Sequence, residues 1–470
     1  MRLRWITAVL LITAGLTGCI GNLVDGDAAE TASTDTEIDA IAPSEEPLFA
    51  NPQTAPHPAF DYPTFTTLSD DEDMPELWEP IDPASFDTSD LELNHTGEDP
   101  GDAEYGSGIA IFGSMVIVPG RSTGSSWVFD ISDPENPELV SEFGAPGRDV
   151  DTLAFPDGRL YAVFATDSGV VPVWNLTNPE DPAKAAELEP DRGSHNVGVV
   201  PGTPLVYNSA GAGGGDTGRV GEGTEGTAIY DFSDPENPEL AQDFENGYSC
   251  HDISFSIRES MDEYRAYCAG YDVTQIWDIA DPADPEVIVD IPVHHGMPDV
   301  PATSATPARF SHLALASNDG DTLIVGDETG GGAAPACDAH TSMGPQTASG
   351  PVGNLYFYDI SDETDPQFQS MLSPDSPALM TDEIQDDPNR ATGSCTAHFG
   401  RIIPAEDRNV LAIGFYARGV NLVDFTDTSN PEIVDQFNEN TNTWDVWFYN
   451  GYLVTGDTQR GMDIFTLDGG

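Results

Sequence analysis

The chain has 470 residues with 82 acidic and 16 basic side chains, a formal net charge of −66. Because proteins bind phosphate backbones through clustered Lys and Arg, this balance excludes nucleic acid as a partner. Hydrophobic residues make up 39% of the chain, which is enough for a core and excludes a wholly disordered acidic protein.

The acidic excess is spread along the whole sequence, in which Lys184 is the only lysine. Such a surface repels itself in dilute salt. At molar salt the Debye length falls to about 3 Å, and the repulsion is screened. This haloarchaeal-type acidic composition therefore favours adaptation to a salt-saturated environment over an acidic partner-binding face.

The N-terminus has the organisation of a secretory signal. Arg2 and Arg4 precede an apolar run, Trp5 to Leu16, and small residues follow it. The run is too short to span a bilayer. We therefore predict a signal peptide over residues 1–18.

Leu16-Thr17-Gly18-Cys19 resembles the lipobox of prokaryotic lipoproteins. The resemblance implies that the signal is removed and that Cys19 carries a lipid. The protein would then be exported to the cell surface and anchored to the outer face of the cytoplasmic membrane through its N-terminal lipid. A plain signal peptide followed by an accidental cysteine is the alternative.

Residues 19–88 are rich in Asp, Glu, Thr, Ser, Ala and Pro and show no lasting periodicity. This composition predicts a lipid-anchored, acidic, disordered tether. A flexible coil of roughly 70 residues has a mean reach of about 45 Å.

One unit recurs through residues 89–470, in which an apolar strand, an acidic turn with proline and a second apolar strand follow one another. Its sixth copy is VNLVDFTDTSNPEIVDQF at 420–437, and the others begin at Ser125, Val170, Thr227, Thr274 and Leu355. A unit repeated at roughly forty to sixty residues predicts a propeller or a solenoid.

Each unit contains four predicted strands, which in the third repeat are residues 195–200, 204–210, 227–232 and 239–244. The last unit lacks its fourth strand, and we expect the alternating segment 90–94 to supply it. We therefore predict an all-β fold, a seven-bladed β-propeller closed by an N-terminal strand. An open solenoid is the alternative. The blades are expected to start near residues 106, 149, 194, 250, 311, 396 and 443.

The repeated pattern of hydrophobic residues, Asp and Pro, and VNLVDF in particular, resembles the LVIVD-repeat β-propellers. The first strands headed by histidine resemble the related choice-of-anchor B family. The resemblance covers roughly residues 100 to 467. It implies a secreted or anchored propeller and names no specific activity.

One position of the repeat collects histidines. At the start of the first strand stand Asp151 in the second blade, His195 in the third, His251 in the fourth, His312 in the fifth and His398 in the sixth. The innermost strands of a propeller surround its channel, so we expect these side chains to form a ring at the channel mouth. Imidazoles with a carboxylate suit Zn, Cu, Fe or Ni.

Blade one has Ser107 at this position and blade seven has Trp444. Asp252 and Asp445 follow the ring position by one residue, where they could orient metal ligands from the second shell or hold turns. The alternative to a metal site is a set of structural histidines that each bond the backbone of a neighbouring blade.

Three long insertions are expected on the face of the ring, at residues 211–226, 330–353 and 375–394. Long loops of this kind are usually functional or disordered. Their shared face favours a binding face for an unknown protein, glycan or small molecule.

Four cysteines remain once Cys19 is assigned to lipid. An exported location favours disulfides, Cys250 with Cys268 and Cys337 with Cys395. A Cys₂His₂ zinc site built from Cys337, His340, Cys395 and His398 is the alternative.

Three functions remain open from the sequence. The first is a binding or scaffold module with a metal in the histidine ring. The second is a metal-dependent extracellular hydrolase or oxidoreductase that uses an open coordination position on the ring. The third is a structural envelope protein. No residues for nucleophilic catalysis are identified from the sequence, because Ser-His-Asp arrangements cannot be read from spacing on this fold.

Overall fold

The computed structural model describes residues 86–95, 106–121, 123–155, 157–209, 226–258, 263–270, 273–292, 310–328, 353–372, 395–403, 408–438, 441–449 and 451–469. For residues 86–95 and 467–469 the backbone alone is described. All of them belong to the larger of two contact units, Ala40–Gly470. Within these ranges, no helix is long and apolar enough to cross a membrane.

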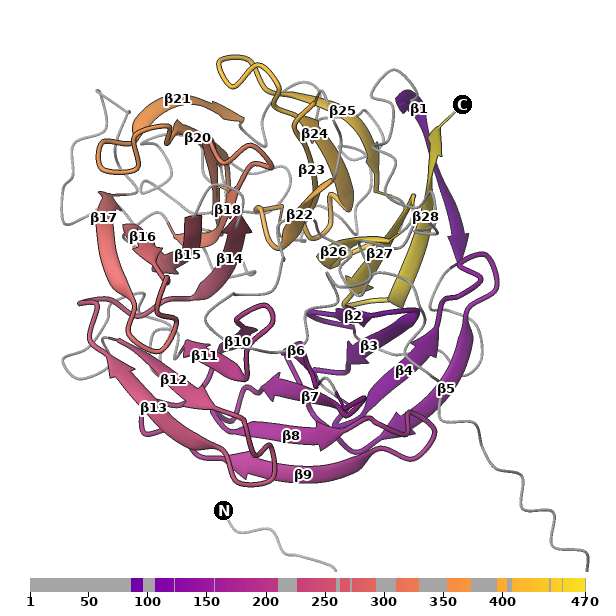
Figure 1. Cartoon of the computed structure of the whole chain (residues 1–470). Coiled ribbons are helices and arrows are strands. Elements are labelled where there is room, and N and C mark those ends of the chain that lie inside the picture. The colour runs from indigo at the N-terminus through magenta and orange to yellow at the C-terminus, as the bar shows by residue number, and fades with distance from the viewer. Residues whose placement is uncertain are drawn as a thin grey trace, which may run out of the picture. The chain divides into compact units, whose positions relative to one another are not determined.

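Seven four-stranded antiparallel sheets follow one another in a ring, so the fold is a β-propeller (Figure 1). Blade one comprises β2 (Ala110–Phe112), β3 (Met115–Pro119), β4 (Ser126–Asp130) and β5 (Glu138–Phe143). Blade two comprises β6 (Asp149–Ala154), β7 (Leu160–Ala165), β8 (Val171–Asn175) and β9 (Ala183–Leu188). Blade three comprises β10 (Asn196–Val199), β11 (Leu205–Ser209), β12 (Thr227–Asp231) and β13 (Glu239–Phe244).

Blade four comprises β14 (Asp252–Arg258), β15 (Glu263–Gly270), β16 (Val273–Asp278) and β17 (Glu286–Pro292), and blade five comprises β18 (Ser311–Ala316), β19 (Thr322–Asp327), β20 (Leu355–Asp359) and β21 (Gln367–Leu372). Blade six comprises β22 (Gly400–Ile403), β23 (Val410–Gly414), β24 (Val420–Asp424) and β25 (Glu432–Phe437). Blade seven comprises β26 (Thr443–Tyr449), β27 (Tyr452–Asp457), β28 (Gly461–Gly469) and, as its fourth strand, β1 (Phe86–His95).

The prediction of a seven-bladed propeller is confirmed. In the third blade, β10 to β13 match the four predicted strands to within one or two residues at each end. The acidic turns after the third strands also behave as expected. The Asp234 carboxylate accepts a hydrogen bond from the backbone N–H of Glu236 at 3.2 Å, which stabilises the turn between β12 and β13.

The N-terminal strand closes the ring, as predicted. β1 pairs antiparallel with β28, with Leu91 opposite Leu467 and Leu93 opposite Phe465. The strand is longer than the alternating segment 90–94, because pairing begins at Phe86. It therefore includes residues 86–88, which the sequence placed in the tether.

The core lies between neighbouring blades. Seven clusters of buried apolar residues each join two adjacent sheets, including the pair formed by the last blade and the first. One example joins Ile117 and Val128 of blade one to Val150 and Phe164 of blade two. Each sheet is thus buried on both faces, which explains the long runs of buried residues in the second and third strands.

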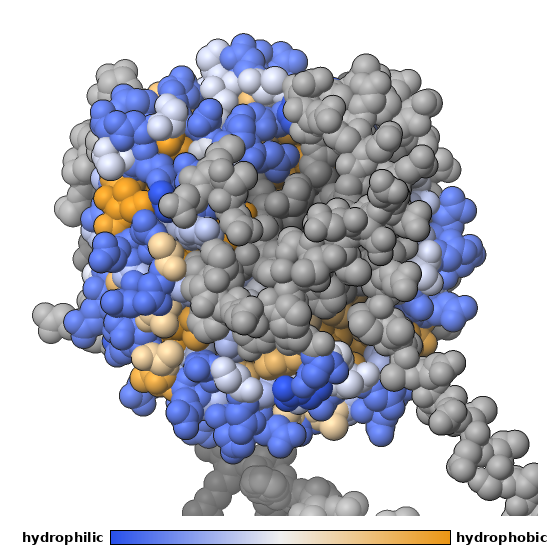
Figure 2. Space-filling view, viewed as in Figure 1, coloured by the Kyte–Doolittle hydropathy of each residue, from blue (hydrophilic) through white to orange (hydrophobic). Residues whose placement is uncertain are grey.

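The outermost strands carry the exposed charge. The large hydrophobic side chains that are exposed in the described residues are Leu139, Leu240 and Val287, all in fourth strands. Figure 2 shows hydrophilic residues over most of the described rim of the face in view. Acidic residues such as Glu138, Glu239 and Glu286 are exposed in these fourth strands, so acidic side chains lie on the perimeter.

Candidate metal centre

In the third, fourth and sixth blades, the start of the inner strand is fixed by one backbone hydrogen bond to the second strand. The N–H of His195 donates to the Ser209 carbonyl at 2.7 Å, and the N–H of His251 donates to the Ala269 carbonyl at 2.6 Å. The same bond is made by His398, to Gly414 at 2.9 Å. Equivalent backbone positions therefore carry these histidines, as the repeat register predicted.

In the second blade this position belongs to Arg148 and not to Asp151. The N–H of Arg148 donates to the Ala165 carbonyl at 2.9 Å, the bond that marks the ring position in the other blades. Asp151 lies three residues later, and its carboxylate accepts from the backbone N–H of Val199 in the next blade at 2.7 Å. Its place in the predicted ring was wrong by three residues, because the sequence alone does not show where pairing with the second strand begins.

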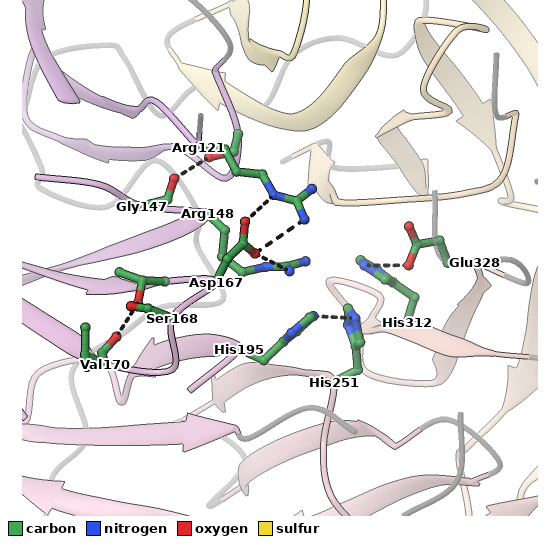
Figure 3. Close-up of polar contacts among 12 residues, drawn as sticks. Arg121, Gly147, Arg148, Asp167, Ser168, Val170, His195, His251, His312 and Glu328 are labelled. Carbon is green, nitrogen blue, oxygen red and sulfur yellow. Dashed lines mark hydrogen bonds and ion pairs between the residues drawn. The ribbon is translucent and has the colours of Figure 1, made fainter. Parts of the chain in front are cut away.

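Four imidazoles contact one another in chain order, and we call His195, His251, His312 and His398 the histidine arc. Successive ring centroids are 4.1, 4.3 and 4.1 Å apart. The Nε2 atoms of His195 and His251 are 2.6 Å apart, so the N–H of one ring donates a hydrogen bond to the Nε2 of the other. Figure 3 shows three of these rings converging on one region.

Glu328, which the sequence reasoning missed, completes the cluster. It directly follows β19, is buried, and places Oε2 3.4 Å from His312 Nε2 and Oε1 3.7 Å from His398 Nε2. His251, His312 and Glu328 each offer one ligand atom, and these three atoms lie within 4.8 Å of one another. Aligning the ends of the second strands as well as the starts of the first would have drawn attention to this carboxylate.

Tyr416 comes from the corresponding end of the second strand in the sixth blade. Its hydroxyl donates a hydrogen bond to Glu328 Oε1, and its ring lies 4.8 Å from that of His398. Its φ of 50° is the one positive value at a non-glycine among the described residues. Strain of this kind, roughly 1–3 kcal/mol, persists where the surroundings fix a residue, often at a functional site.

Burial sets the protonation of the cluster. It lowers the pKa of all four arc histidines well below the usual range, so they are neutral at neutral pH. It also raises the pKa of Glu328 to about 7, although the hydrogen bond from Tyr416 works in the opposite direction. The arc therefore offers imidazole lone pairs beside the carboxyl group of Glu328, which titrates near pH 7.

The hydrogen bonds of the imidazoles suit a metal ion. His398 Nδ1 donates to the Trp444 carbonyl at 2.6 Å, which leaves the lone pair of the neutral ring on Nε2. Neither ring nitrogen of His312 has a hydrogen bond within the described residues, although the side chain is fully buried. Buried polar atoms without partners are costly, and an ion bound at the ring nitrogen that carries the lone pair would satisfy one of the two.

Asp252 and Asp445 act elsewhere. Asp252 accepts from the side-chain amide of Asn196 at 3.3 Å. Asp445 accepts from the backbone N–H of Ile109 at 3.1 Å and from the Trp447 indole at 3.0 Å. These contacts tie neighbouring inner strands together, so both carboxylates belong to the framework between blades and the prediction that they orient metal ligands is not supported.

The Cys250–Cys268 disulfide is present, with Cα atoms 5.3 Å apart, and it fixes the residue directly before His251. Cys395 is also disulfide-bonded. The alternative Cys₂His₂ zinc site is therefore wrong, because this thiolate is already used. Cys19, Cys337 and His340 lie outside the described residues, as do residues 19–85 of the predicted tether and nearly all of the three long insertions.

Comparisons with known proteins add little. No family model matches the chain, and no curated protein matches its sequence. Among solved structures, it is similar to Sqt1 of Saccharomyces cerevisiae, with 11% sequence identity, a TM-score of 0.46, and coverage of 80% of this chain and 87% of that one. A likeness at this level carries no argument about function, and the LVIVD-repeat assignment stays a prediction.

Replacing Tyr416 by Phe should destabilise the protein at pH 8, where Glu328 is ionised. The change removes the hydroxyl that donates to a buried carboxylate, an interaction worth about 1.5–3 kcal/mol. Denaturant unfolding in high salt measures the loss. Tyr207→Phe is the matched control, because that buried hydroxyl donates to a neutral carbonyl, of Pro282, at 2.6 Å, and should cost only about 1 kcal/mol. An equal or smaller loss for Tyr416→Phe contradicts the expectation.

Proposed function

We propose that the protein is a metal-binding β-propeller, whose histidine arc and Glu328 hold one divalent transition-metal ion. The observation that carries this proposal is the group of three buried ligand atoms, from His251, His312 and Glu328, within 4.8 Å of one another. The donor set of two imidazoles and one carboxylate suits Zn, Cu, Fe or Ni. His195 and His398 flank the three ligands.

Purely structural histidines are the competing explanation. The bond from His398 to the Trp444 carbonyl is of the kind that such histidines would make, and it joins two blades. His312 does not fit this explanation, because its ring is buried without such a bond in the described part of the chain. Four adjacent neutral imidazoles beside a carboxyl group are better explained by a common ion than by four separate structural roles.

We infer a binding module as the first function and a metal-dependent enzyme as the second candidate. Three protein ligands leave coordination positions open, which is the arrangement of catalytic rather than closed structural sites. A divalent ion would act there as a Lewis acid. The Tyr416 hydroxyl, next to Glu328, is the observation that favours the enzyme, because it places a proton donor beside the ligands.

We further propose that the propeller is a cell-surface lipoprotein of the LVIVD-repeat type, adapted to high salt. The support is the sequence of residues 16–19, the acidic tether composition and the net charge of −66. In this arrangement the lipid on Cys19 holds the protein at the outer face of the membrane.

Metal analysis of protein purified in high salt should find about one metal ion per chain after incubation with Zn, Cu, Fe or Ni salts. His312→Ala and Glu328→Gln should each weaken binding at least about a hundredfold, because each removes one of three ligands. Glu187→Gln is the matched control, since that exposed carboxylate pairs with Lys184 and should not affect the ion. Wild-type protein without stoichiometric metal, together with unchanged affinity in both variants, contradicts the proposal.

The affinity for the ion should rise with pH up to about 7 and level off above about 8. Below its pKa of about 7 the Glu328 carboxyl carries a proton that the metal must displace, which costs up to about tenfold in affinity per pH unit. The arc histidines are already neutral in this range and add no slope. The titratable and charged groups that act on Glu328 are His312, His398, Tyr416, Asp327, Arg121 and Arg148.

Titrations with metal at pH 6, 7 and 8 check this slope. Glu328→Gln should abolish it, because an amide does not titrate. A wild-type affinity that is independent of pH, or a slope that survives in Glu328→Gln, shows that another group controls binding.

Cys19→Ser should release the protein into the medium, because the variant lacks the thiol that would carry the lipid. Fractionation of cells into membrane and medium, followed by immunoblotting, measures this. Replacing Cys395 by Ser is the control, since that cysteine is engaged in a disulfide and should not affect anchoring. Retention of Cys19→Ser on the membrane refutes the proposed anchor.

A further inference from the structure

Two arginines lie at the open end of the histidine arc. Arg148 occupies the ring position in blade two, next to His195 in blade three, and Arg121 follows β3 in blade one. Figure 3 shows their guanidinium groups on one side, with His195, His251 and His312 pointing toward them from the other. Since the whole chain has only 16 basic residues against 82 acidic ones, two adjacent guanidinium groups at its centre call for an explanation.

The pair shares a single counter-charge. Asp167 accepts from Arg121 Nε at 2.9 Å, from Arg121 Nη2 at 3.3 Å and from Arg148 Nη1 at 3.1 Å. Elsewhere Arg159 and Arg192 pair with one carboxylate each. Arg121, Arg148 and Asp167 together therefore keep a formal charge of +1 when Asp167 is ionised, and ionised Glu328 is the further carboxylate that acts on Arg148.

Donor capacity remains on the arginine pair. Arg148 Nε is buried and has no hydrogen-bond partner within the described residues. An arginine offers five N–H donors in a planar fork that matches the oxygens of a carboxylate or a phosphate. The repulsion between the two guanidinium groups is only partly offset by Asp167, because one carboxylate faces two cations.

Trp444 holds the pair against the arc. The guanidinium carbons of Arg121 and Arg148 lie 4.9 and 5.6 Å from the centroid of its ring, and the ring of His398 lies 4.2 Å from it. One indole thus contacts both the cationic group and the last histidine of the arc. The stacking orients the guanidinium groups and fixes them beside the metal ligands.

The local charge favours an anionic ligand. Over most of the surface the acidic side chains repel anions, so an anion binds only where cations are concentrated. The arginine pair supplies that concentration, and Arg148 acts electrostatically on all four arc histidines and on Glu328. A metal ion in the arc would add positive charge on the opposite side.

We propose that Arg121 and Arg148 form the recognition site for a small molecule that carries a carboxylate or phosphate group. The guanidinium groups bind oxygens of that group, and a further oxygen of the ligand occupies an open coordination position of the metal. The second contact rests on the proposed metal site, whereas the first depends only on the arginine pair. Asp167 positions both guanidinium groups and limits their charge.

Calorimetric titration with two probes, inorganic phosphate and oxalate, tests this proposal at constant high KCl, with metal-loaded and with metal-free protein. Wild-type protein should bind at least one probe, and more tightly when loaded with metal. Arg148→Gln and Arg121→Gln should each weaken binding at least tenfold without changing the metal content. Arg159→Gln is the matched control, because its partner Asp157 lies in an exposed turn.

Arg148→Lys, which keeps the charge and loses the planar fork, should bind more weakly than wild type. Thermal unfolding of each variant verifies folding. If the Arg148 variants do not fold, the Arg121→Gln variant still tests the proposal. The Arg121 side chain is 36% exposed, against 11% for Arg148, so its replacement disturbs the packing less.

The outcomes separate the two proposals. Metal-loaded protein that binds neither probe, or binds them equally well in the arginine variants, overturns the anion site and leaves the metal site standing. Protein that takes up no metal, yet binds a probe through the arginines, overturns the metal site and supports the anion site.

Discussion

Packing of each sheet against both of its neighbours is the constraint on which the rest of the structure depends. A single blade has two apolar faces and cannot bury either one alone, so all seven interfaces must form together. The pairing of β1 with β28 completes the last blade with the first described strand of the chain. Because the ring is closed, the starts of seven inner strands meet at one place.

That meeting point has an electrostatic character opposite to that of the rim. The outermost strands expose acidic side chains such as Glu138 and Glu239, whereas the centre contains neutral imidazoles, two guanidinium groups and the carboxyl group of Glu328, whose pKa is raised by burial. The chain thus concentrates imidazole nitrogens, and positive charge that Asp167 offsets only in part, where the inner strands begin. Such a contrast favours anionic ligands at the centre and solubility in concentrated salt at the rim.

Two sets of chain positions build the centre. The starts of the inner strands supply Arg148, the histidine arc and Trp444, and the ends of the second strands supply Arg121, Asp167, Glu328 and Tyr416. The second set positions the first, because Asp167 binds the arginines and Tyr416 fixes Glu328 against the histidines. The strained backbone at Tyr416 belongs to this arrangement.

The repeat was enough to predict the blade count, the closing strand and the four histidines, because it has a fixed spacing and side-chain direction follows the strand register. The Cys250–Cys268 disulfide, which joins the residue two positions before β14 to β15, was also predictable. That Arg148 and not Asp151 stands in the ring emerges from the folded chain, since it depends on where backbone pairing begins. Folding alone brought Glu328, Tyr416 and Arg121 to the arc, because contacts between blades join residues that no local pattern connects.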